Sequence, residues 1–157
     1  MKHILEEFVK NILQDNNDYS EFTKELKSMK DKSGNKYLDE DDKVIYRIPK
    51  RGLMTNLLIF TTKKLIVGNR GNWDDDLHFY YENFITHKII QNKFFFIKLD
   101  LLVKPEFDKD WGGSMCEFYV NKKYSKSYKD LHCNILTMYN PDLFDTNTNW
   151  DKVISGE

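Results

Sequence analysis

The sequence predicts an α+β domain in which a strand-rich middle lies between helical ends. Residues 53–68 hold two short apolar runs separated by four polar residues, which is the pattern of a β-hairpin. Residues 2–14 and 122–139 place apolar side chains at steps of three and four, which predicts an amphipathic helix at each end. Short apolar runs fill most of residues 43–120, and runs of that length favour strands.

The first 37 residues predict a helical extension made of two helices. The apolar stripe of the first helix is Ile4, Leu5, Phe8, Val9, Ile12 and Leu13. The second helix carries Tyr19, Phe22, Leu26 and Met29 on one face, and either Asp18 or Ser20 can cap its start. The acidic run at residues 38–42 lacks the alternating spacing of a calcium loop, so we expect a solvated turn there.

Strands are predicted in order from residue 43. The first alternates over residues 43–48 and stops at Pro49, and the hairpin of residues 53–68 follows. The later strands are expected at residues 78–81, 84–90, 94–103 and 115–120, with Gln91 and Asn92 as a turn and Phe94 and Phe95 inside a strand. The closing helix carries one stripe made of Tyr124, Tyr128, Leu131, Ile135 and Met138, and it ends before Pro141.

The composition is that of one globular domain. Its 157 residues are enough for one sizeable core, and 15% aromatic residues exclude a disordered chain. The net charge of −1 gives no overall attraction to nucleic acid, although residues 1–42 hold eleven acidic residues against seven lysines. Two cysteines without a Cys-x-x-Cys motif, and no signal-peptide or membrane-spanning pattern, predict a cytoplasmic protein.

Residues 58–67, Leu-Ile-Phe-Thr-Thr-Lys-Lys-Leu-Ile-Val, resemble the hairpin of bacterial pleckstrin-homology-like (PH-like) families. Residues 81–85, Tyr-Glu-Asn-Phe-Ile, resemble a short segment that these families carry before their closing helix. The resemblance covers about residues 43–140. It implies a partly open barrel of about seven antiparallel strands, capped by the C-terminal helix. The predicted organisation is an extension at residues 1–37 packed on the main domain, the barrel with its helix at 38–140, and a tail at 141–157.

The resemblance also implies a domain that binds rather than catalyses, through loops gathered at the open end of the barrel. The candidate partner-binding residues in these loops are Lys50, Arg51, Arg70, Trp73, Lys109 and Trp111. Two tryptophans in loops are typical of binding anchors, or each packs its own loop against the barrel. Carboxylates beside Trp73 disfavour an anionic lipid, so we expect a protein or peptide partner rather than a membrane surface.

Two other functions stay open at this point. The chain could be an immunity or antitoxin-type protein that neutralises one toxin enzyme through an acidic face. It could also be a metal-dependent enzyme that uses Asp74, Asp75, Asp76 and His78, because carboxylate and imidazole are ligands of divalent metals. No second cluster completes a metal shell, so we expect neither metal nor cofactor and no enzymatic activity.

The remaining histidines and cysteines predict no catalytic pair. His3, His87 and His132 are isolated in the sequence, and surface or capping positions are expected for them. Cys133 lies next to His132, but neighbours on a helix point about 100° apart and do not face each other.

Overall fold

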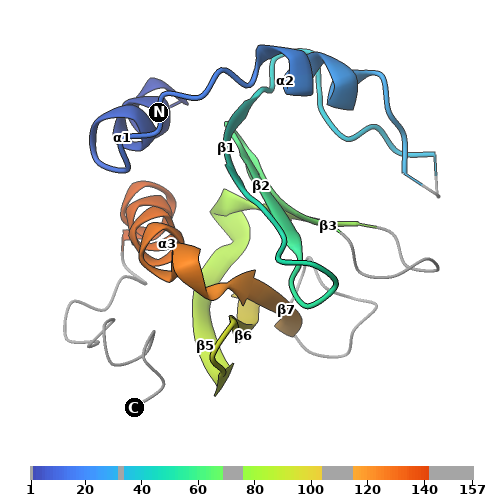
Figure 1. The fold of residues 1–157 in the computed structure, drawn as a ribbon. Coiled ribbons are helices and arrows are strands. Elements are labelled where there is room, and N and C mark those ends of the chain that lie inside the picture. Colours follow the sequence, from blue (N-terminus) through green and yellow to red (C-terminus); the bar gives the residue numbers. More distant parts are fainter. Residues whose placement is uncertain (1, 32–33, 69–75, 104–114, 142–157) are drawn as a thin grey trace.

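The computed structural model describes residues 2–31, 34–68, 76–103 and 115–141. These residues form two antiparallel sheets, a C-terminal helix packed against them and two N-terminal helices (Figure 1). The predicted α+β class with antiparallel sheets and a closing helix is confirmed. The two sheets are separate in their strand pairing, so they do not form a closed barrel.

The first sheet contains four strands in sequence order: β1 (Val44–Ile48), β2 (Leu57–Thr61), β3 (Lys64–Gly68) and β4 (Leu77–Tyr80). The predicted hairpin is confirmed, because β2 and β3 pair with Leu57 opposite Gly68 and Phe60 opposite Leu65. All five residues of β3 are buried. A strand buried on both faces needs a second layer on its outer side.

Helix α2 (Ser20–Lys27) supplies that layer, whereas helix α1 (Lys2–Asn11) packs into the main core. Helix α2 packs Leu26 into an outer cluster with Val44, Ile59 and Ile66. Helix α1 lies beside the C-terminal helix and buries Leu5 and Val9 in the main core (Figure 1). The apolar stripe predicted for residues 2–14 is only partly buried, because Ile4 and Ile12 are 53% and 61% exposed.

The second sheet has three strands: β5 (Phe84–Asn92), β6 (Phe96–Val103) and β7 (Met115–Asn121). A short 3-10 helix, η1 (Tyr81–Asn83), joins it to the first sheet. The predicted turn at Gln91 and Asn92 is wrong, since β5 runs through both residues. The chain reverses instead at residues 93–95, where the Lys93 amide donates to the Phe96 carbonyl at 2.9 Å.

The closing helix α3 (Ser125–Tyr139) follows a 3-10 turn, η3 (Lys122–Tyr124). Its stripe is confirmed at Tyr128, Leu131 and Ile135, which are buried in the core shared with both sheets. His132 was expected at a surface or cap, and this prediction is wrong. Its ring is fully buried between Phe84 and Tyr128, with centroid distances of 5.5 and 5.8 Å.

The acidic run before β1 is only partly solvated. Asp39, Glu40 and Asp41 are exposed, as expected for a solvated turn. Asp42 is 1% exposed, and its carboxylate accepts hydrogen bonds from the Thr61 and Thr62 side chains and from the Thr62 amide. The prediction is therefore wrong for Asp42, which is a structural acceptor under the β2–β3 turn.

Within the part of the chain that the structure describes, no helix has both the length and the apolar character required to cross a membrane.

Candidate functional site

Two of the six predicted partner-binding residues are described by the structure. Lys50 and Arg51 are exposed in the loop between β1 and β2, at residues 49–56. The other four, Arg70, Trp73, Lys109 and Trp111, lie outside the described residues. Their predicted gathering at one rim therefore stays a prediction. The described part of the candidate site lies around Lys50 and Arg51.

The loop at 49–56 is held at its base by Asn56. The Asn56 amide donates to the Tyr119 carbonyl of β7 at 2.9 Å, and its side-chain oxygen accepts from the Tyr119 amide at 2.8 Å. Its side-chain nitrogen donates to the Gly68 carbonyl of β3 at 2.8 Å. A single buried side chain thus ties the loop to both sheets, which fixes where the tip of the loop emerges.

The tip itself is apolar and open to solvent. Gly52 adopts φ +56°, a left-handed conformation that side chains disfavour, and the Met54 amide donates to the Arg51 carbonyl at 3.1 Å. This tight turn leaves Leu53 98% exposed and Met54 46% exposed. Large apolar side chains presented in this way have no role in the core.

The turn at residues 93–95 lies beside this loop. The Arg51 guanidinium stands over the Phe95 ring, 4.2 Å from its centroid. Phe94 packs edge-on against Phe95 at 4.8 Å and is 83% exposed. Both phenylalanines were expected inside a strand, and this prediction is wrong because β6 begins at Phe96. Three consecutive aromatic residues after Asn92 and Lys93 were the only signal in the sequence for an aromatic turn.

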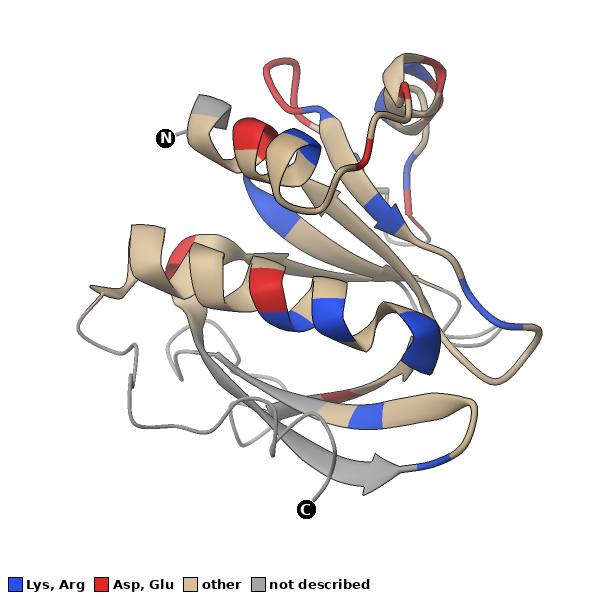
Figure 2. Ribbon diagram, turned by 60° about the vertical axis from the view of Figure 1, so that its left-hand side comes forward, with Lys and Arg blue, Asp and Glu red and all other residues tan. Residues whose placement is uncertain are grey.

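A third segment completes the surface. The Lys122 amide, at the start of η3, donates to the Phe95 carbonyl at 3.2 Å. Lys122 and Lys123 are exposed. Figure 2 shows basic segments from the 49–56 loop, the 93–95 turn and the start of η3 at the same end of the molecule. We call this surface the basic rim; it consists of Lys50, Arg51, Leu53, Met54, Lys93, Phe94, Phe95, Lys122 and Lys123.

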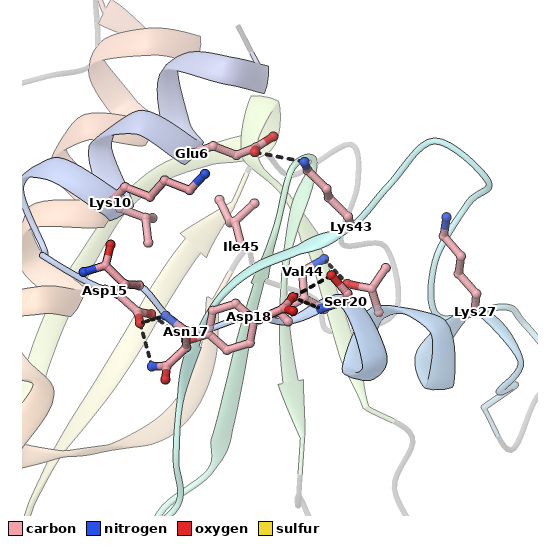
Figure 3. A pocket seen from close by; sticks show the side chains of 14 residues that line it. Glu6, Lys10, Asp15, Asn17, Asp18, Ser20, Lys27, Lys43, Val44 and Ile45 are labelled. Carbon is pink, nitrogen blue, oxygen red and sulfur yellow. Dashed lines mark hydrogen bonds and ion pairs between the residues drawn. The ribbon is translucent and has the colours of Figure 1, made fainter.

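Apart from the basic rim, a hollow with a volume of about 580 Å³ lies between α1, the start of α2 and β1 (Figure 3). Several of its charged groups have partners inside the molecule. Lys43 pairs with Glu6 at 2.9 Å, and Asp18 accepts from the Ser20 amide and hydroxyl. Asp15 accepts a hydrogen bond from the Tyr19 hydroxyl. Burial is the main cause that raises the pKa of Tyr19, and this hydrogen bond is the second. We therefore interpret the hollow as the solvated seam between the extension and the first sheet.

Asp76 and His78 from the proposed metal cluster both contact Tyr37. The Tyr37 hydroxyl donates to the Asp76 carboxylate at 2.6 Å, and the Tyr37 and His78 rings lie 5.5 Å apart. Asp74 and Asp75 lie outside the described residues. Among the residues that the structure describes, no group of three or more His, Cys, Asp or Glu side chains could hold a metal.

Cys133 is half-buried on α3, and burial raises the pKa of its thiol to about 11. A thiol that stays protonated at neutral pH is a poor nucleophile. The adjacent His132 ring is enclosed by two aromatic rings in the core. Neither side chain therefore has the environment typical of a nucleophile or its general base.

Comparison of the chain with protein-family models and with curated proteins finds no match.

Proposed function

We propose that this chain is a non-catalytic PH-like interaction domain that binds a protein or peptide partner through the basic rim. The order of the elements supports the PH-like interpretation: antiparallel strands follow one another along the chain and a helix comes last. The helix buries Tyr128, Leu131 and Ile135 against residues of both sheets, which suits a helix that plugs one corner of a partly open barrel.

The observation that carries the binding function is the composition of the basic rim. It exposes Leu53 and Phe94 almost completely, on a backbone that Asn56 and Phe95 tie to the rest of the fold. Phe94 and Arg51 resemble the aromatic and arginine anchors that dominate binding energy at protein interfaces, and Leu53 adds exposed apolar surface beside them.

A capture experiment with matched variants tests this function. The rim variant is Leu53→Ser with Phe94→Ser. The control is Ile4→Ser with Ile12→Ser, which removes two exposed apolar side chains from α1 and the residue that follows it instead. Wild type and control should recover the same partner from an extract of the source cells, and the rim variant should lose it. If all three recover the same partner, the basic rim is not the binding surface.

The two loop tryptophans are tested in the same way. Trp73→Ala and Trp111→Ala should each weaken partner binding by about 2 kcal/mol or more, the hot-spot scale, with little change in melting temperature. If both variants melt at lower temperature and still capture the partner, the two tryptophans stabilise their own loops and do not bind.

A further inference from the structure

We infer that the partner segment seated on the basic rim is an acidic polypeptide that carries at least one large apolar side chain. The inference rests on the proposed function and adds the chemistry of the partner. It follows from the charge of the rim, from the geometry of Arg51 and from the exposed apolar side chains.

The charge of the rim has one sign. Residues 49–56, 93–95 and 121–124 contain Lys50, Arg51, Lys93, Lys122 and Lys123 and no Asp or Glu. The chain as a whole has a net charge of −1, so the rim is a local concentration of positive charge on a nearly neutral molecule. Such a surface attracts a carboxylate-bearing partner and repels a basic one, which governs partner choice.

Arg51 is held in a geometry that suits a carboxylate. The Arg51 guanidinium lies over the Phe95 ring, with its central carbon 4.2 Å from the ring centroid. The donors of a guanidinium point outward in its plane, and two of them match the two oxygens of a carboxylate. Contact with the ring restricts the Arg51 side chain, so less conformational entropy is lost when a carboxylate binds.

The apolar side chains give the partner its second requirement. Leu53 and Phe94 stand on two different segments that Arg51 and Phe95 hold together. A purely ionic ligand would leave both side chains in water. A leucine or aromatic residue of the partner, flanked by carboxylates, covers them while the lysines reach its acidic neighbours.

A peptide segment fits this end of the molecule better than a lipid surface. The Asp76 carboxylate lies beside Gly68, whose carbonyl accepts the bond from Asn56 at the base of the rim loop. A carboxylate near the base of the rim loop repels an anionic surface. This repulsion disfavours an extended membrane more than a narrow peptide.

The test is a selection from a random twelve-residue peptide library against the full chain. Peptides enriched on wild type should be net negative and should contain a leucine or an aromatic residue. Their affinity should fall about 30-fold or more for Lys50→Glu with Arg51→Glu, which is the hot-spot scale. Leu53→Ser with Phe94→Ser should weaken them similarly, and the control Ile4→Ser with Ile12→Ser should leave them unchanged. All the substituted residues are exposed, and melting temperatures verify that each variant is folded.

The outcomes separate this inference from the proposed function. If the selected peptides are neutral or basic and the rim variants no longer bind them, the inference of an acidic partner is wrong, but the rim is still the binding surface. Acidic peptides that bind every variant equally would overturn both. If no peptide is enriched, and vesicles of phosphatidylcholine with phosphatidylserine bind wild type but not the rim variants, the partner is a membrane and the inference is wrong. If neither peptides nor vesicles bind, the inference is also wrong.

Discussion

Removing the carboxylate of Asp42 should destabilise the domain more than removing any exposed carboxylate of the same run. Asp42 is buried and accepts from the Thr62 hydroxyl at 2.6 Å, the Thr61 hydroxyl at 3.0 Å and the Thr62 amide at 3.1 Å. It also counteracts the lowering of the Lys64 pKa by burial. Hydrogen bonds to a charged group contribute about 1.5–3 kcal/mol each, and they are not fully additive. Asp42→Ala should therefore lower the free energy of unfolding by about 3–5 kcal/mol.

Asp41 provides the matched control. It is the adjacent carboxylate, 2.7 Å from the Lys63 ammonium, and its side chain is 61% exposed. An exposed ion pair contributes about 0–1 kcal/mol, so Asp41→Ala should change stability little. Asp42→Asn keeps one acceptor oxygen and should fall between the two. Urea unfolding followed by circular dichroism measures all three. If Asp42→Ala and Asp41→Ala cost the same, the buried carboxylate does not support the β2–β3 turn and the reasoning is refuted.

Three further results are expected. Ile135→Asp should lower the free energy of unfolding by about 3–5 kcal/mol, because Ile135 is fully buried. Thr137 is exposed on the same helix, so Thr137→Asp should change the free energy of unfolding by no more than about 0.5 kcal/mol; equal losses would mean that the stripe is not buried. The native Cys133 thiol should react with iodoacetamide slowly at pH 7.5 and faster as the pH rises toward its pKa of about 11, since the thiolate is the reactive form. Mass spectrometry of the Cys133 peptide measures the alkylation rate, and a rate at pH 7.5 equal to that of an unhindered small thiol would contradict the prediction. Protein purified without added metal should contain far less than one equivalent of zinc or manganese; one equivalent that Asp76→Ala or His78→Ala removes would favour the metal-dependent enzyme.

Features that depend on neighbours in the sequence were predictable. The hairpin of β2 and β3 follows from two apolar runs with four polar residues between them, because β-branched and aromatic residues favour a pleated surface. The buried stripe of α3 at Tyr128, Leu131 and Ile135 follows from the helical period alone. Lys50 and Arg51 were found as loop residues because Pro49 and Gly52 mark the end of a strand and a turn.

Features that depend on distant residues were decided by the tertiary structure. Asp42 belongs to a charge run in the sequence, and only the arrival of Thr61 and Thr62 makes its burial favourable. His132 follows no apolar pattern, yet Phe84 from another element supplies one of the two rings that enclose it. The basic rim brings together residues 51, 95 and 122, whose contacts no local period encodes. Local spacing sets the direction of a side chain relative to its own helix or strand, whereas the packing of the sheets and helices determines which groups from elsewhere it meets.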